Sequence, residues 1–486
     1  MRPDHSGARV RAHLVHFSAL VLLAGGLSGC ASMTGIAPHA TLRDAPSLGL
    51  SSQSNSSATL DSQWWREFGD TQLDRLVERA LAANPSLRVV QARLARAQAG
   101  AEGVNAATGP QLNGVIDATR QKFTATGMIP APLAGAVYET GTAQFTASWE
   151  LDFFGKNRAA LLAALGSVAA AQADADAART LLASNVARSY FQLARQHAQL
   201  AVAHRLLAQR TQVLRLVQDR VNAGLDTRLE LRQSEGALPD ARLQIETLQE
   251  QLMLSRHALA ALLGEANGSL ALEPPALAAI KNIAGPAMLP SDLLGRRADV
   301  AAARWRVEVA TRDVSNAQAQ FYPNINLVGF AGFSSIGLDR LLGAGSEQWG
   351  VGPALRLPLF DGGRLRANLR GKTADLDAAV ESYNVAVIDA VREVTDQLAS
   401  IQSIERQQVE QRAAQALAEG AHAIALARYD AGIGNFLAVL AAEIPVLNQH
   451  RQAVDLAARA LDTQVALMRA LGGGYRAESA VAVAPN

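Results

Sequence analysis

The sequence predicts an α+β membrane protein with a duplicated half-protomer, built from long α-helical coiled-coil hairpins and four transmembrane β-strands. The first observation is an internal repeat: 151–158 (LDFFGKNR) recurs as 357–364 (LPLFDGGR), and 220–225 (RVNAGL) recurs as 428–433 (RYDAGI), at offsets of 206 and 208 residues. The second is a pair of long segments without proline, and the third is a set of segments that alternate apolar and polar residues. A repeat of this length indicates a duplicated half-domain rather than a solenoid unit, so a pseudo-twofold protomer is expected.

The N-terminus has the pattern of a secretory signal. Three arginines precede an apolar run at 14–24, and Leu-Ser-Gly-Cys follows, ending at Cys30. Such a run is too short to span a bilayer as a stable helix. The ending resembles the bacterial lipobox, which implies a cleaved signal and an acylated Cys30, the only cysteine of the chain. Ala31, where inner-membrane lipoproteins often have aspartate, implies the outer membrane by the same resemblance.

These patterns divide the chain into six segments. Two are the repeats, which are joined by a linker and flanked by N-terminal segments and a tail. The expected bounds are 1–29 for the signal peptide, 30–62 for the lipidated tether, 63–265 for the first repeat, 266–289 for the linker, 290–472 for the second repeat and 473–486 for the tail. Each repeat is expected to hold short helices, one β-hairpin and two long helices, in that order.

The short helices of the first repeat are expected at 72–83 and 87–102, separated by Asn84 as a cap and Pro85 in the first turn. Proline suits this position because the first helical N–H has no partner within the helix. The second repeat has matching patterns at 291–295 and 298–320.

Each repeat then contains a predicted β-hairpin, at about 111–152 and about 324–359. In the clearest strand, 143–152, Ala, Phe, Ala, Trp and Leu alternate with Gln, Thr, Ser, Glu and Asp. Strict alternation over about ten residues is typical of a tilted strand with one face in lipid and the other in water. Four such strands cannot close a barrel, and an open edge is not tolerated in lipid, so oligomerisation is expected. Two protomers would supply eight strands and three would supply twelve.

Two long helices follow the hairpin in each repeat. They are expected at about 155–223 and 227–263 in the first repeat and at about 363–431 and 435–471 in the second. A helix of nearly seventy residues would extend about 100 Å at ~1.5 Å per residue. Leucine or valine recurs every seven residues along much of both longer helices, which is a coiled-coil signature.

Tight turns join the two long helices of each repeat. In the first turn, Gly224 suits a left-handed C-cap, and Thr227 with Glu230 three residues later forms a capping box. The second turn has Gly432 and Asn435 at the equivalent places, but Ala438 instead of the acid.

The chain resembles the TolC-type outer-membrane factor family, and within it the branch of NodT- and OprM-like efflux lipoproteins. The resemblance spans nearly the whole mature chain. Its markers are 64–65 (WW) with Phe68 and Leu73, the helix break at 80–85, 149–152 (WELD) with Gly155, 289–294 (LPSDLL) with Arg296 and Arg297, 322–323 (YP) and 358–363 (PLFDGG). It implies a homotrimer whose twelve-stranded β-barrel in the outer-membrane lipid continues into an α-helical barrel in the periplasm. It also implies a passive exit duct with two protein partners, a periplasmic adaptor (membrane fusion) protein and an inner-membrane pump, expected to be proton-driven.

The same resemblance assigns roles to the turns. The tips that dock the adaptor would be Gly224, Leu225, Asp226, Thr227, Gly432, Ile433, Gly434 and Asn435. The closed entrance in relatives has acids at the positions of Ala438 and Ala441, so the ring of charge is missing here. Glu230 and Tyr429 are retained where the family latches neighbouring helices, but Gly434 stands where some relatives have arginine.

Catalytic and cofactor chemistry has no sequence signal. No nucleotide-binding loop, Cys/His metal cluster or nucleophilic constellation is present, so neither an enzyme nor a bound cofactor or metal is expected. His197 and His204 lie seven residues apart on a helix, two turns from one another, which suits solvated or satisfied histidines better than metal ligands. Basic and acidic residues are interleaved and the net charge is +1, which argues against a nucleic-acid partner.

Two other functions remain open from the sequence. One is the outer-membrane component of a type I secretion system, which shares the same architecture. The other, less favoured, is a non-conducting envelope coiled-coil protein, which would have no use for polar strand faces. The cargo cannot be read from the sequence.

Overall fold

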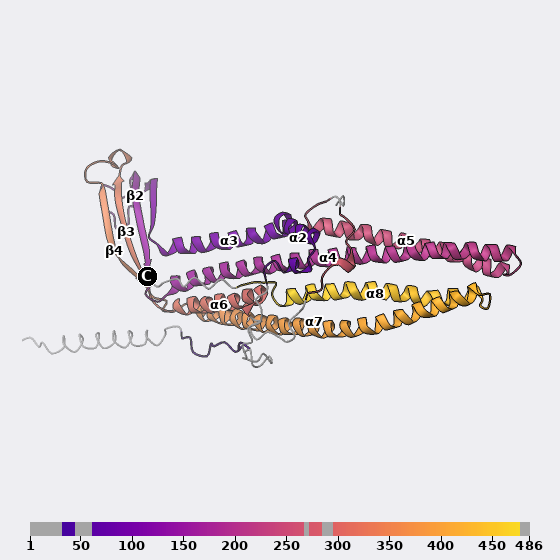
Figure 1. Cartoon of the computed structure of the whole chain (residues 1–486). Coiled ribbons are helices and arrows are strands. Elements are labelled where there is room, and N and C mark those ends of the chain that lie inside the picture. The colour runs from indigo at the N-terminus through magenta and orange to yellow at the C-terminus, as the bar shows by residue number, and fades with distance from the viewer. Residues whose placement is uncertain (1–31, 44–60, 267–271, 284–294, 477–486) are drawn as a thin grey trace, which may run out of the picture. The chain divides into compact units, whose positions relative to one another are not determined.

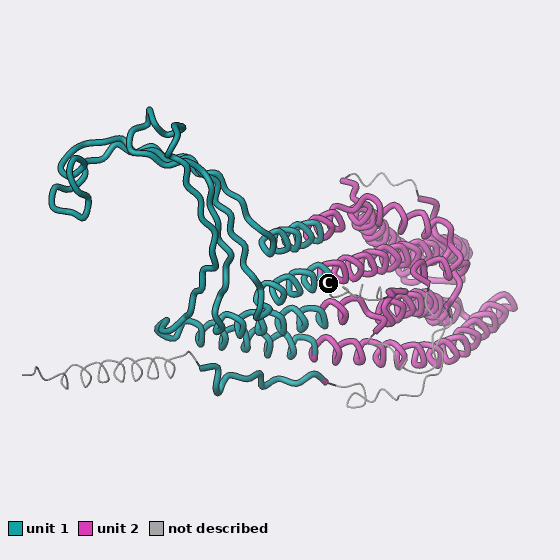
Figure 2. The backbone as a smooth tube through the Cα atoms, turned by 90° about the vertical axis from the view of Figure 1, so that its left-hand side faces the viewer, with its two compact units in different colours: residues 1–42, 94–170, 303–383 teal, residues 43–93, 171–302, 384–486 magenta. Residues whose placement is uncertain are grey.

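The computed structural model describes residues 32–43, 61–266, 272–283 and 295–476, and these fall into two compact units. Figure 2 colours the units: one comprises 1–42, 94–170 and 303–383, and the other comprises 43–93, 171–302 and 384–486. Each unit therefore takes segments from both sequence repeats. The expected signal peptide, Cys30 and the expected helix at 291–295, except for Gly295, lie outside the described residues.

The first unit contains one antiparallel sheet, with the strand order β1-β2-β3-β4. The strands are β1 (Gln111–Lys122), β2 (Val137–Leu151), β3 (Asn324–Ile336) and β4 (Glu347–Arg356). Both predicted hairpins are present, and β2 pairs with β3 to join them (Figure 1). The strand β2 begins six residues before the clearest alternation does.

The register of the sheet makes one face mainly polar and the other mainly apolar, although Val328 and Phe330 of β3 lie on the polar side. Ser148 pairs with Gln111 on one side and with Val328 on the other, while Trp149 pairs with Leu327. Because successive residues of a strand point to opposite faces, Gln144, Ser148 and Glu150 share one face with Gln348, to which Gln144 is hydrogen-bonded at 2.8 Å. The other face is apolar over much of its area, and its Ile116, Trp349 and Val351 are more than 70% exposed.

Seven α-helices are described. The long ones are α4 (Lys156–Asn222), α5 (Arg228–Leu262), α7 (Arg364–Asp430) and α8 (Phe436–Ala470), each within a residue of its predicted bounds. The shorter ones are α2 (Thr71–Ala83), α3 (Pro85–Thr108) and α6 (Ala298–Ala319). Asn84 accepts a hydrogen bond from the Ser86 amide at 2.7 Å, which makes it the predicted cap of α3. Within the described residues, no helix combines the length and apolar character needed to cross a membrane.

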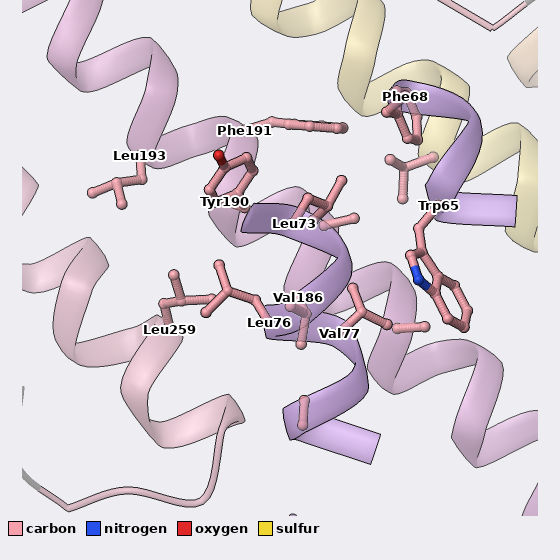
Figure 3. Packing of buried hydrophobic residues seen from close by; sticks show 14 of the residues in the cluster. Trp65, Phe68, Leu73, Leu76, Val77, Val186, Tyr190, Phe191, Leu193 and Leu259 are labelled. Atoms are coloured by element: carbon pink, nitrogen blue, oxygen red, sulfur yellow. The ribbon is translucent and has the colours of Figure 1, made fainter. Parts of the chain in front are cut away.

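The main core lies in the second unit, where α2 and the short 3-10 helix η2 (Trp64–Phe68) cover one face of α4. Figure 3 shows Phe68 beside Phe191, and their ring centroids are 4.9 Å apart in an edge-on arrangement. The Tyr190 hydroxyl donates a hydrogen bond to Asp70 Oδ2 at 2.7 Å, while Asp70 Oδ1 caps α2. Leu193, which begins a run of leucines spaced seven residues apart along α4, is fully buried in the same cluster.

Candidate functional site

The first hairpin tip connects α4 to α5. Gly224 has φ = +72°, and the Leu225 amide donates to the Arg220 carbonyl at 2.8 Å, which closes the end of α4. A residue other than glycine resists this left-handed conformation. Thr227 begins α5 with the predicted capping box, in which the Thr227 amide donates to Glu230 Oε2 at 3.0 Å. The Leu225 side chain is 66% exposed.

The second tip, between α7 and α8, repeats this backbone. Gly432 has φ = +75°, and the Ile433 amide donates to the Arg428 carbonyl at 3.0 Å. Asn435 Oδ1 accepts from the Ala438 amide at 2.9 Å and so replaces the capping box with a single cap. Ile433 is 71% exposed. Both glycine turns thus present an exposed aliphatic side chain at the same position.

The first tip has an ion pair that the second tip lacks and that the sequence analysis did not predict. Arg220 binds Asp226 through two hydrogen bonds, at 2.9 and 3.1 Å. Arg428 occupies the equivalent place in the second copy, but there Gly434 replaces the acid. A Cβ at Gly434 would lie 3.1 Å from the Tyr429 amide nitrogen, so this turn is tight and also lacks the ion pair. The signal available in the sequence was the alignment of Asp226 with Gly434.

Arg220 also joins the two hairpins. Its guanidinium carbon lies 5.0 Å from the centroid of the Tyr429 ring, a cation–π contact. Tyr429 packs edge-on against Phe436, with centroids 5.3 Å apart, in a cluster with Val217 and Val439. Glu230 is hydrogen-bonded to Thr227 instead, and the charged side chain that Tyr429 contacts is that of Arg220. Within one protomer, the expected pair of Glu230 and Tyr429 is therefore not formed.

The positions assigned to the missing ring of acids lie at the start of α8. Ala438 and Ala441 are both exposed in the protomer. The nearest acid on this helix, Glu443, is 4% exposed, and no described residue hydrogen-bonds its Oε1 atom. Burial raises the pKa of Glu443, although the charge of Arg210 opposes the shift. Asp430, at the end of α7, is exposed.

The segment that follows Cys30 lies along α7. Asp377 Oδ1 accepts from the amides of His39 and Ala40 at 2.8 and 2.9 Å. Arg366 donates to the carbonyls of Ser32 and Thr34. The beginning of the predicted tether is thus held by side chains of a long helix.

No group of three or more metal-ligand side chains occurs within the part of the chain that the structure describes. His197 is partly buried, and burial lowers its pKa, with the charge of Arg256 acting in the same direction. The Nε2 atom of His197 is buried, and no described residue hydrogen-bonds it.

Comparison with known proteins gives one consistent result. A family model described as outer membrane efflux protein matches residues 76–265 and 289–473. The chain is 34% identical over 424 residues to the multidrug resistance outer membrane protein MdtQ of Escherichia coli O157:H7, covering 86% of this chain and 88% of MdtQ. It is 38% identical over 366 residues to the fusaric acid resistance protein FusA of Burkholderia cepacia, covering 73% and 69%. The crystal structure of the outer membrane protein VceC of Vibrio cholerae matches with a TM-score of 0.80 at 36% identity, covering 85% of this chain and 99% of VceC.

Proposed function

This chain belongs to the outer membrane efflux protein family, and from that premise we propose that it is the exit duct of a tripartite efflux system. The observation that carries the proposal is the sheet of four strands with a polar and an apolar face, attached to long paired helices in a chain of this family. Three protomers would supply twelve strands, enough to close a barrel with a water-filled interior. The helices would then continue the bore into the periplasm.

The partners follow from the same role. A passive duct needs an inner-membrane pump to supply energy and a periplasmic adaptor to make the connection. We propose that the adaptor docks on the two hairpin tips and that the pump is proton-driven. The names of MdtQ and FusA refer to resistance to drugs and to fusaric acid, so small toxic organic molecules are the proposed cargo. A transporter ATPase encoded beside this protein would instead favour type I secretion.

Anchoring by Cys30 belongs to the same proposal. Each buried methylene of an acyl chain contributes ~0.8 kcal/mol, so several chains hold a protein to a bilayer almost irreversibly. Mass spectrometry of the mature protein is expected to show an acylated N-terminal Cys30, and Cys30→Ala protein should lack this mass. Acylation of the Cys30→Ala protein would contradict the assignment.

Conductance is the direct test of the duct. Purified protein should run as a trimer and open aqueous channels in planar bilayers, and deletion of the gene should sensitise cells to the cargo. A stable trimer that never conducts would leave the envelope coiled-coil function as the better description.

A further inference from the structure

A large groove edged by charged side chains runs along α4 in the second unit, walled by α5 and α8. It has a volume of about 1100 Å³. The charged residues that line it are Arg188, Arg195, Arg459, Asp455 and Asp462. Three arginines against two aspartates leave one positive charge in each protomer.

The aspartates are already paired, which leaves Arg459 as the source of this charge. Arg188 Nε lies 2.5 Å from Asp462 Oδ1, and Arg195 Nε lies 2.7 Å from Asp455 Oδ1. Gln199 donates a further hydrogen bond to Asp455 at 2.6 Å. Arg459 is exposed, and among the described residues no carboxylate lies within ion-pair distance of its guanidinium. It therefore has its full set of N–H donors available to a ligand.

The charged side of the groove lies on the side of α4 that is turned away from α2 and η2, and Phe191 of the main core forms part of its wall. At 100° per residue, Arg188, Gln192 and Arg195 point away from the side that presents Val186 and Tyr190 to α2 and η2. The helices α2 and η2 form an extra layer against α4. Inside a tube built of the long helices this layer would block the duct, so an open duct requires the layer to lie outside the tube. On the proposed function, the groove therefore faces the bore.

We propose that this groove is a transit subsite for small organic carboxylates, with Arg459 as the residue that binds the carboxylate. A guanidinium offers two parallel N–H groups that match a carboxylate, a geometry that a chloride ion does not use. The exposed Ala258 and Ala261 and the half-buried Leu262 give an apolar wall for the rest of the molecule. Water reaches the whole site, so binding is weak, as transit through a channel requires.

The test uses purified wild-type trimer in planar bilayers, with benzoate as the probe. Benzoate should reduce the chloride current reversibly. The reversal potential in a salt gradient should indicate a preference for anions over cations. Arg459→Gln should raise the half-blocking benzoate concentration about tenfold, because one charge-assisted hydrogen-bonded pair is lost, and should shift the reversal potential towards cations. Arg412→Gln is the matched control, since this exposed arginine of α7 does not line the groove, and should behave as wild type.

Orientation towards the bore is tested separately with Arg459→Cys. A negatively charged methanethiosulfonate reagent should change the current of this variant and leave that of the wild type unchanged. Channels that conduct but show equal benzoate block in all three proteins, or an Arg459→Cys current that the reagent does not alter, would overturn the subsite alone. A wild-type trimer that does not conduct would overturn the duct function on which the subsite rests.

Discussion

Arg297 is a cation almost removed from water, with 5% of its surface exposed. Its guanidinium donates to Asp299 at 3.0 and 2.6 Å, to Glu393 at 2.9 Å and to the Ala470 carbonyl at 3.2 Å. Burial alone would lower the pKa of Arg297, but the two carboxylates outweigh it and raise the pKa. Arg297 thus connects the start of α6 to α7 through an ion pair and to the end of α8 through a backbone carbonyl.

Removing this cation should be costly. Arg297→Met would remove the cationic partner of Asp299 and one of the two cationic partners of Glu393, the other being Arg469. Breaking a fully buried pair typically costs about 3–5 kcal/mol, and the half-exposed Asp299 places this loss towards the lower end. Arg392→Met is the control, because Arg392 forms only exposed ion pairs with Asp389 and Asp396, each worth at most about 1 kcal/mol. Thermal unfolding of the purified trimer should show a much lower midpoint for Arg297→Met than for Arg392→Met. Equal midpoints would contradict a stabilising role for the buried network.

Glu443 should make the tip region sensitive to pH. Burial raises its pKa, so the folded protein retains a proton that the unfolded chain has already lost at the same pH. Stability should therefore be greatest below the ordinary glutamate pKa of about 4.3 and fall as pH rises through the raised folded value. Hydrogen exchange at the start of α8 should slow in Glu443→Gln at neutral pH, and its pH dependence should flatten. The exposed Asp430→Asn variant should change neither.

At the scale of elements, the bounds of the four long helices are predicted to within a residue because their signals are local, whereas α3 extends six residues beyond its predicted end at 102. Glycine at the turns and the Thr227 capping box lie within a few residues of the helix ends that they define. Heptad spacing is likewise visible within a single helix. The strand β2 is longer than predicted because its first residues, Val137–Thr142, alternate weakly, and pairing with β1 extends them. The contact of Arg220 with Tyr429 joins residues 209 positions apart, so no local pattern could reveal it.

The tips provide a test of docking. A Cβ added at Gly224 or Gly432 would meet nothing within 4 Å, so substitution costs only the backbone strain of about 1–2 kcal/mol. Gly224→Asp and Gly432→Asp should therefore leave the trimer and its outer-membrane level intact but abolish drug resistance in cells. Gly224→Asn distinguishes the effect of backbone strain from the effect of a changed tip surface, because asparagine tolerates this backbone conformation. If both aspartate variants keep normal resistance, the glycines serve only to end the helices.

For the whole molecule, the missing acids should set ion preference at the entrance. Ala438 and Ala441 are exposed, whereas the nearby Glu443 is buried. Three protomers with two acids each would concentrate negative potential in a narrow bore, and this chain lacks them. Wild-type channels should be nearly insensitive to a trivalent cation added from the periplasmic side, and Ala438→Asp with Ala441→Asp should create block. Tight block of the wild type would make Asp430 the next acid to test.

Pro239 and Pro445 lie inside α5 and α8, 206 residues apart, between the tips and the main core. A proline has no N–H to donate, so the carbonyls of Glu235 and Ala441 lack their usual helical partner. Each returning helix therefore lacks one backbone hydrogen bond close to its tip, at a place where helices bend most readily. A force applied to either tip would bend the helix near its proline. The buried Leu461 and Val465 of α8, which lie in the main core, would then keep their positions.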